Sequence, residues 1–148
     1  MQLSKEDMFC EVQQPDKSTT SGSTVTTAST NVLDFGNHGD DVLNKLFWSL
    51  FVDADSNGVT VKAQWYTSDY EGFVDGSNNA SETKLFETDT IAAASLTAGA
   101  YIVKNAPLPK GLKRYNRLKF VCSTGTTSPK VTAFVHDGRD EGTPFKGL

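Results

Sequence analysis

Histidine and cysteine are scarce in this sequence, and their scarcity excludes most catalytic and metal chemistry. The two histidines, His38 and His136, and the two cysteines, Cys10 and Cys122, lie far apart in the chain. His136 precedes Asp137, but neighbouring residues of a strand point to opposite faces, so this pair does not form a catalytic triad. The inventory also disfavours a zinc site, and the patterns GxxxxGKS, GxGxxG and GxSxG are absent. We therefore predict no catalytic residue, no cofactor and no metal.

Long apolar runs are also missing. No stretch of about 18 apolar residues occurs, which excludes a membrane-spanning helix, and the first residues, MQLSKEDMFCEV, lack the apolar core of a secretory signal. The net charge of −4 identifies no partner and argues against direct nucleic-acid binding, which favours a basic surface. We expect Cys10 and Cys122 to be reduced thiols, because the protein is expected to be made in the cytosol. The alternative is a disulfide, which would need their Cα atoms within about 7 Å.

Serine, threonine, glycine and asparagine are plentiful, which suits a β-rich domain with many turns. The 148 residues make about one domain. We predict an N-terminal arm and polar loop over 1–24, a β-sandwich over 25–137 and a surface tail over 138–148. Strand patterns occur at 25–35, as two strands joined by a tight turn within 45–66, and at 82–90, 100–105, 114–123 and 130–137. About eight antiparallel strands of this kind predict an all-β, jelly-roll-like sandwich.

The segment 45–66, KLFWSLFVDADSNGVTVKAQWY, has the strongest pattern in the chain. The dipeptide Asn57-Gly58 favours a type I′ turn, so we predict a hairpin with Val52 opposite Ala63 and Leu50 opposite Trp65. Its apolar face should lie on a second layer of the sandwich. That face comprises Leu46, Trp48, Leu50, Val52, Val61, Ala63 and Trp65. The other face carries Asp53, Lys62, Gln64 and Tyr66, with Phe47 and Phe51 among them.

A calcium-loop pattern, DxDxNG, occurs at Asp53, Asp55, Asn57 and Gly58. The twelfth position is Gln64 instead of a bidentate glutamate, and the flanking segments alternate like strands rather than helices. We therefore interpret the motif as a polar hairpin turn, with Asp53 paired to Lys62 across the strands.

Three segments carry a resemblance to a known family. They are STNVLDFG at 29–36, LTAG at 96–99 and LPKGLKRYNRL at 108–118. They resemble the capsid cement (decoration) proteins of tailed bacteriophages, a family typified by a Bordetella phage protein, over roughly residues 1–137. The resemblance implies a jelly-roll homodimer, made in the host cytoplasm, that sits on the outer surface of the virion. It also implies that the protein clamps neighbouring major capsid subunits and performs no catalysis.

The resemblance suggests where two kinds of contact lie. Phe47, Phe51 and Tyr66 are candidates for a self-complementary dimer patch, because a two-fold interface uses the same surface on both copies. The alternative is that the chain's own N-terminal arm or residues 70–74 cover them. Candidate capsid contacts are Met8 and Phe9 in the N-terminal arm and the basic row Arg114, Arg117 and Lys119. The alternative for the basic row is a solvated face or a protected sheet edge.

Two other functions remain open from the sequence. The first is a receptor- or carbohydrate-binding jelly roll of a phage fibre or spike, with Tyr66, Tyr70 and Phe73 lining an aromatic site. The predicted burial of Trp48 and Trp65 counts against it. The second is an enzyme on a cupin-like barrel, which would need two or three histidines that converge on a metal.

Overall fold

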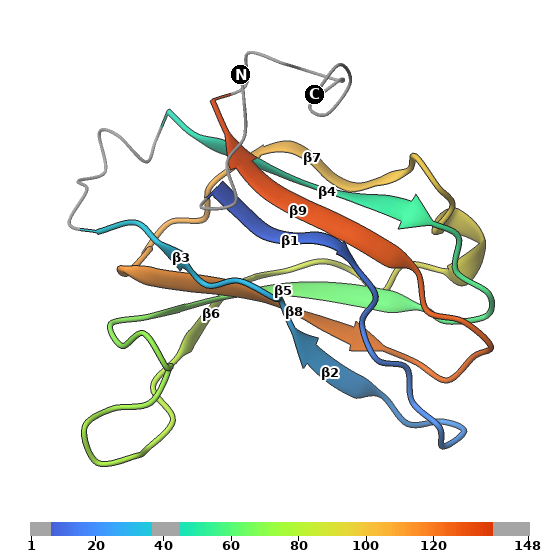
Figure 1. Cartoon of the computed structure of the whole chain (residues 1–148), viewed down its shortest axis with the longest axis horizontal. Helices are drawn as coiled ribbons and strands as arrows, with labels where there is room; N and C mark the ends of the chain where they lie inside the picture. The colour runs from blue at the N-terminus through green and yellow to red at the C-terminus, as the bar shows by residue number, and fades with distance from the viewer. Residues whose placement is uncertain (1–6, 37–44, 138–148) are drawn as a thin grey trace.

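The computed structural model describes residues 7–36 and 45–137, which form two antiparallel sheets stacked face to face (Figure 1). One sheet has the strand order β1-β9-β4-β7, and the other has the order β2-β8-β5-β6 with β3 also beside β8. The strands are β1 (Met8–Gln13), β2 (Val25–Ala28), β3 (Leu33–Asp34), β4 (Phe47–Ala54), β5 (Val61–Ser68), β6 (Thr83–Glu87), β7 (Tyr101–Pro107), β8 (Tyr115–Cys122) and β9 (Lys130–His136), with the short 3-10 helix η2 (Ala93–Ser95) between β6 and β7.

The strand order is that of a jelly roll. The chain changes sheets six times, from β1 to β2, β3 to β4, β4 to β5, β6 to β7, β7 to β8 and β8 to β9. β2 pairs with residues 119–122 of β8, and β3 pairs with residues 115–116, so the two behave as one interrupted strand. Eight strand positions in two four-stranded sheets with these crossovers confirm the predicted all-β, jelly-roll-like sandwich. Within the described residues, no helix is long and apolar enough to cross a membrane.

The core lies between the sheets and is centred on two tryptophans. The rings of Trp48 on β4 and Trp65 on β5 meet edge to face, with centroids 5.0 Å apart, and Phe9 on β1 contacts Trp65 at 4.9 Å. The indole N–H of Trp65 donates to Asn116 Oδ1 at 3.0 Å, which satisfies its polar atom inside the core. The predicted burial of both tryptophans is confirmed.

The predicted hairpin at Asn57-Gly58 is wrong. β4 and β5 belong to different sheets, so Leu50 pairs with Ala133 and Val103 instead of facing Trp65. The apolar residues of 45–66 do face the core, but they do so from two opposed sheets. This arrangement buries them against one another, whereas a hairpin would have placed them all on one face that needed a separate cover.

The crossover between β4 and β5 is held against the turn that precedes β9. Asn57 donates its N–H to the carbonyl of Thr127 at 2.8 Å, and Gly58 has φ +80°. A Cβ on Gly125 would lie 2.5 Å from the carbonyl carbon of Gly58, so only glycine allows this approach. Asn57 lacks the positive φ of a type I′ turn, because contacts with a distant turn hold the dipeptide.

The N-terminal boundary differs from the expected one. Met8–Gln13 does not form an arm, because it pairs with β9 as an edge strand of the sandwich. The domain therefore includes residues that precede the predicted start at 25. The described residues leave out 1–6, 37–44 with His38, and the predicted tail at 138–148.

Candidate binding surfaces

The outer face of the sheet β2-β8-β5-β6 carries an ion-pair network built on Glu82. Its carboxylate accepts hydrogen bonds from Arg117 Nη2 at 2.9 Å and from Lys119 Nζ at 2.6 Å. The three side chains are only about a fifth exposed. Burial raises the pKa of Glu82, but the hydrogen bonds from Lys119 and Arg117 outweigh it, so the net pKa is lowered from 4.5. The network therefore holds an ionised carboxylate against two outward-facing cations.

Aromatic rings complete this network. Lys119 Nζ lies 4.3 Å from the ring centroid of Tyr66, and the Arg117 guanidinium lies 4.0 Å from that of Phe73. Phe73 is only 2% exposed. Its cation–π contact with Arg117 holds the 69–81 segment against the sheet. Arg117 Nε is buried without a hydrogen-bond partner. The Phe73 ring, over which the guanidinium lies, helps to shield this atom from water.

Glu87 forms a second, more exposed cluster on the same face. It binds Gln64 Nε2 at 2.9 Å and Lys62 and Lys84 at 3.2 Å. The hydrogen bonds from Gln64, Lys62 and Lys84 lower the pKa of Glu87 to about 2. The predicted pair Asp53–Lys62 is therefore wrong, because the two residues lie on different sheets and Lys62 binds Glu87.

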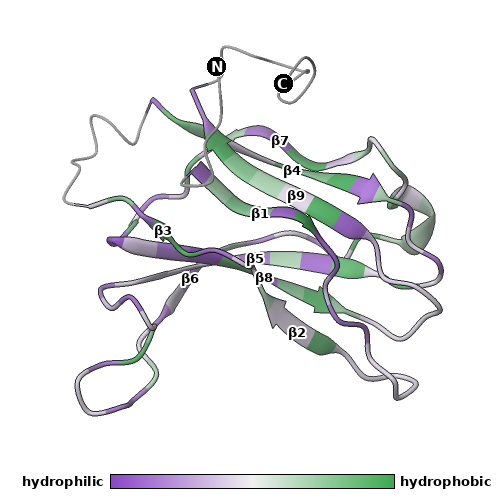
Figure 2. Ribbon diagram, viewed as in Figure 1, coloured by the Kyte–Doolittle hydropathy of each residue, from purple (hydrophilic) through white to green (hydrophobic). Residues whose placement is uncertain are grey.

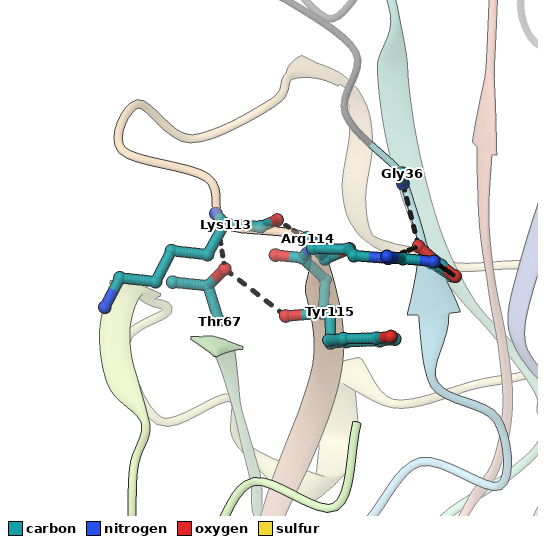
Figure 3. A network of polar contacts seen from close by, with 7 residues as sticks. Gly36, Thr67, Lys113, Arg114 and Tyr115 are labelled. Carbon is teal, nitrogen blue, oxygen red and sulfur yellow. Dashed lines mark hydrogen bonds and ion pairs between the residues drawn. The ribbon is translucent and has the colours of Figure 1, made fainter. Parts of the chain in front are cut away.

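Arg114 is also paired, at the start of β8. Its Nε and Nη2 atoms donate to both oxygens of Asp34 at 2.8 and 3.0 Å, and the same carboxylate accepts the N–H of Gly36 (Figure 3). Its guanidinium also lies 5.1 Å from the ring of Tyr115. Asp34 raises the pKa of Arg114 through its hydrogen bonds and its charge. Together with the Glu82 network, this pair means that every cation of the predicted row is compensated within the chain, which disfavours these cations as contacts with an acidic capsid surface.

The outer face of the sheet β1-β9-β4-β7 is aromatic instead. Phe51 lies 5.7 Å from the ring of Tyr101 and 6.2 Å from that of Phe134, and Phe47 lies 6.3 Å from His136. Phe47 and Phe51 are half-buried, whereas Phe134 and His136 are buried. Tyr66 projects from the other sheet, so the structure does not unite the predicted patch of Phe47, Phe51 and Tyr66. Tyr101, which the sequence did not single out, is the neighbour of Phe51.

Ser49 and His136 form a buried hydrogen bond on this face, with 3.0 Å between Oγ and Nε2. Ser49 Oγ also accepts the backbone N–H of Asn105 at 2.9 Å. Because Ser49 is completely buried, a substrate cannot reach its hydroxyl in this conformation. The pair connects β4, β7 and β9, which is a structural role.

The residues of the DxDxNG pattern do not converge. Asp53 accepts from the hydroxyl of Thr132 at 2.6 Å, while Asp55 accepts the N–H of Ala98 at 2.7 Å. Among the described residues, no group of three or more His, Cys, Asp or Glu is arranged to hold a metal. Burial raises the pKa of Asp53 from 3.8, partly opposed by the Thr132 hydrogen bond. The motif belongs to a crossover between the sheets, and its interpretation as a hairpin turn was wrong.

Met8 and Phe9 are not available as surface contacts. Both are buried in β1, and Phe9 is part of the core against Trp65. The two cysteines are free and buried, and burial raises the pKa of each thiol to about 12. Neither thiol is therefore a nucleophile at neutral pH.

Hollows at two places among the described residues are not lined by aromatic side chains. One of about 240 Å³ lies between residues 14–17 and 126–128, and one of about 220 Å³ lies beside Met8 and Asn31. Phe73, proposed to line a carbohydrate site with Tyr66 and Tyr70, is buried beneath Arg117. The geometry thus disfavours the fibre or lectin interpretation.

Glu82 is the residue of the outer-face ion-pair network that sequence reasoning missed. Its partners lie 35 and 37 residues further along the chain, so no local spacing identifies the contact. The only local signal was the alternation of Arg117 and Lys119 with buried residues in β8, which correctly placed both on the outer face.

Comparison with protein-family models identifies a family for this chain. No curated protein matches the chain. A family model described as Bbp16 matches residues 18–135, which is most of the chain and nearly the whole sandwich. This protein therefore belongs to the Bbp16 family, which is named after a Bordetella phage protein and indicates a structural role in a phage.

Proposed function

We propose that this protein binds the outer surface of a phage capsid and cements neighbouring major capsid subunits without catalysing a reaction. The Bbp16 match over residues 18–135 carries the proposal. The protein would be made in the host cytoplasm and would bind neither nucleic acid nor membrane directly. Its work would be adhesion, in which many weak, repeated contacts across a shell add up to strong retention.

The chemistry of the fold supports an adhesive role. The outward cations Arg114, Arg117 and Lys119 are compensated by carboxylates of the chain, and the buried Ser49–His136 pair connects three strands. A sandwich with these internal connections transmits load between the surfaces that it bridges, because a close-packed core deforms little.

We propose further that the protein acts as a homodimer. Half-buried Phe47 and Phe51, together with Tyr101, place aromatic surface on the outer face of the sheet β1-β9-β4-β7. A second copy related by a two-fold axis would cover this face. Light scattering after size exclusion should give the mass of two chains for the wild type, and a Phe47→Ser variant should shift toward the mass of one chain. A wild type of one-chain mass at micromolar concentration would reject the dimer.

The cementing role has a direct test. Capsids from a phage that lacks the gene should lose DNA or break at a lower temperature than wild-type capsids, and purified protein added back should restore survival. DNA release during heating, followed with an intercalating dye, measures both effects. Equal thermal survival with and without the protein would reject the proposal.

A further inference from the structure

The 69–81 loop, which connects β5 to β6, is the most prominent exposed apolar feature of the described chain. Two of its side chains, Tyr70 and Val74, are 44% and 43% exposed. The loop extends below the lower sheet in Figure 1, away from the sheet β1-β9-β4-β7. Two exposed apolar side chains on one projecting element offer contact surface to a partner.

The loop is ordered by its own contacts. Asp75 Oδ1 accepts the N–H groups of Ser77 and Asn79 at 2.8 and 3.0 Å, and these backbone hydrogen bonds lower the pKa of Asp75. Val74 and Ala80 form a β-bridge that closes the tip. A loop that already has its bound shape loses little conformational entropy when a partner docks.

Phe73 anchors the base of the loop. It adopts φ +60°, which is uncommon for a bulky residue, and it is buried beneath Arg117. With Phe73 turned inward, its neighbour Val74 is turned outward. The structure thus uses one aromatic residue to fix the loop and leaves two apolar side chains for contact.

The charge of this region is one-sided. Residues 69–82 contain four acidic residues, Asp69, Glu71, Asp75 and Glu82, and no lysine or arginine. The rest of the chain contains fourteen acidic and fourteen basic residues, so the formal net charge of −4 comes entirely from this segment. Glu82 and Asp69 pair with cations elsewhere in the chain, which leaves Glu71 and Asp75 as the acidic side chains of the loop that would complement a basic partner with an apolar patch.

We infer that the 69–81 loop is a preformed docking element that places Tyr70 and Val74 on an apolar patch ringed by basic residues on the major capsid protein. The inference deepens the proposed cementing function and rests on it. The acidic residues steer the approach and the two apolar side chains supply the close contact.

Co-sedimentation of purified protein with capsids that lack it tests this inference. The variant Tyr70→Ser with Val74→Ser should bind at least about tenfold more weakly than the wild type, because such contacts dominate interface energies. The matched control is Val12→Ser, the same change at a 51% exposed valine of β1, which should bind within about twofold of the wild type. Thermal unfolding of each variant alone checks that the fold is intact, and the single variant Val74→Ser replaces the double one if that unfolds.

A charge variant gives an independent measurement. Glu71→Gln should weaken binding at low salt and flatten its dependence on ionic strength, whereas Glu11→Gln, an exposed glutamate of β1, should leave both unchanged. If the loop variants bind capsids as tightly as the wild type does, the inference is overturned but the cementing function stands. A loop variant that instead loses self-association would also overturn it, since the loop would then contact a second copy. Wild-type protein that does not bind capsids would overturn the cementing function and the inference together.

Discussion

Strands β8 and β9 each lie between two neighbours in the middle of a sheet, yet their outer sides differ. β8 alternates strictly, with Leu118 and Phe120 in the core and Arg117 and Lys119 half-buried on the outside. β9 is buried on both sides from Val131 onward. Figure 2 shows the same contrast, with β9 largely hydrophobic and β8 mixed.

The difference shows that the outer faces of the two sheets are stabilised by different interactions, ion pairs on β8 and packing on β9. On β8 the chain supplies its own counter-ions, chiefly Glu82, so the charged face is electrostatically balanced. On β9 the outer residues Thr132, Phe134 and His136 are at most 3% exposed and pack with aromatic neighbours. We therefore expect the stability of the outer β9 side to depend on packing and that of the outer β8 side on pH and pairing.

The largest effect should come from Phe134. Replacing it with alanine removes a fully buried ring from the outer side of β9 and should lower the free energy of unfolding by about 3 kcal/mol or more. Val121→Ala, on the half-buried outer side of β8, should cost less than about 1 kcal/mol. Urea unfolding measures the free energy of unfolding of both variants. Equal losses in the two would contradict the proposed difference between the outer sides of β8 and β9.

Glu82→Gln should have the next largest effect, on the β8 side. It leaves Arg117 and Lys119 without their carboxylate and should cost about 1–2 kcal/mol at pH 7. Because the pKa of Glu82 is lowered from 4.5, its stabilisation is present above that pH and is lost as the pH falls through the folded-state pKa. The difference from the wild type should therefore shrink on acidification, and a constant difference between pH 7 and pH 3 would contradict the ion-pair account.

Asp53→Asn, at the residue that binds Thr132 of β9, should raise the free energy of unfolding at pH 7, by less than Glu82→Gln lowers it. Burial raises the pKa of Asp53 above 3.8, so its neutral form fits the folded state better. The associated stability is present below pH 3.8 and is lost as the pH rises through the folded-state pKa. A permanently neutral asparagine should thus raise the urea midpoint slightly at pH 7 and leave it unchanged at pH 3. A lower midpoint at pH 7 would show that the Thr132 hydrogen bond needs the charge.

Arg114→Ala should have the smallest effect. Both Arg114 and Asp34 are nearly half exposed, so water and salt screen their attraction despite the two-pronged hydrogen bond. Its urea midpoint should lie closer to the wild-type value than that of Glu82→Gln, and the shift should decrease in salt on the order of 1 M. A shift as large as that of Glu82→Gln would show that exposure does not distinguish the two ion pairs.

The sequence predicted which side of each strand is buried but not which strands are neighbours. Alternation placed Trp48, Trp65 and Phe120 in the core correctly, because the period of a strand is a local property. The pairing of β4 with β9 and of β5 with β8 joins residues more than 45 positions apart, which no local pattern encodes. Asn57-Gly58 misled for this reason, since a distant turn at Thr127 holds it.

The ion-pair network shows the same difference between local patterns, which the sequence reveals, and long-range contacts, which it does not. The outward direction of Arg117 and Lys119 was predictable from alternation, whereas their shared partner Glu82 was not. The arm expected at Met8 and Phe9 failed because two apolar residues among charges form a short edge strand when a sheet is available to receive them. Such a receiving surface becomes visible only after the fold has formed.

The antiparallel pairing of β1 with β9 has a mechanical consequence. Met8 at the start of β1 lies opposite Phe134 near the end of β9, so the first and last strands of the sandwich begin and end at the same end of one sheet. Tension between those two points would peel β1 from β9 one hydrogen bond at a time, which is the weakest direction in which a sheet can be loaded. The sandwich should therefore resist force that acts across its two sheets better than tension between the start of β1 and the end of β9.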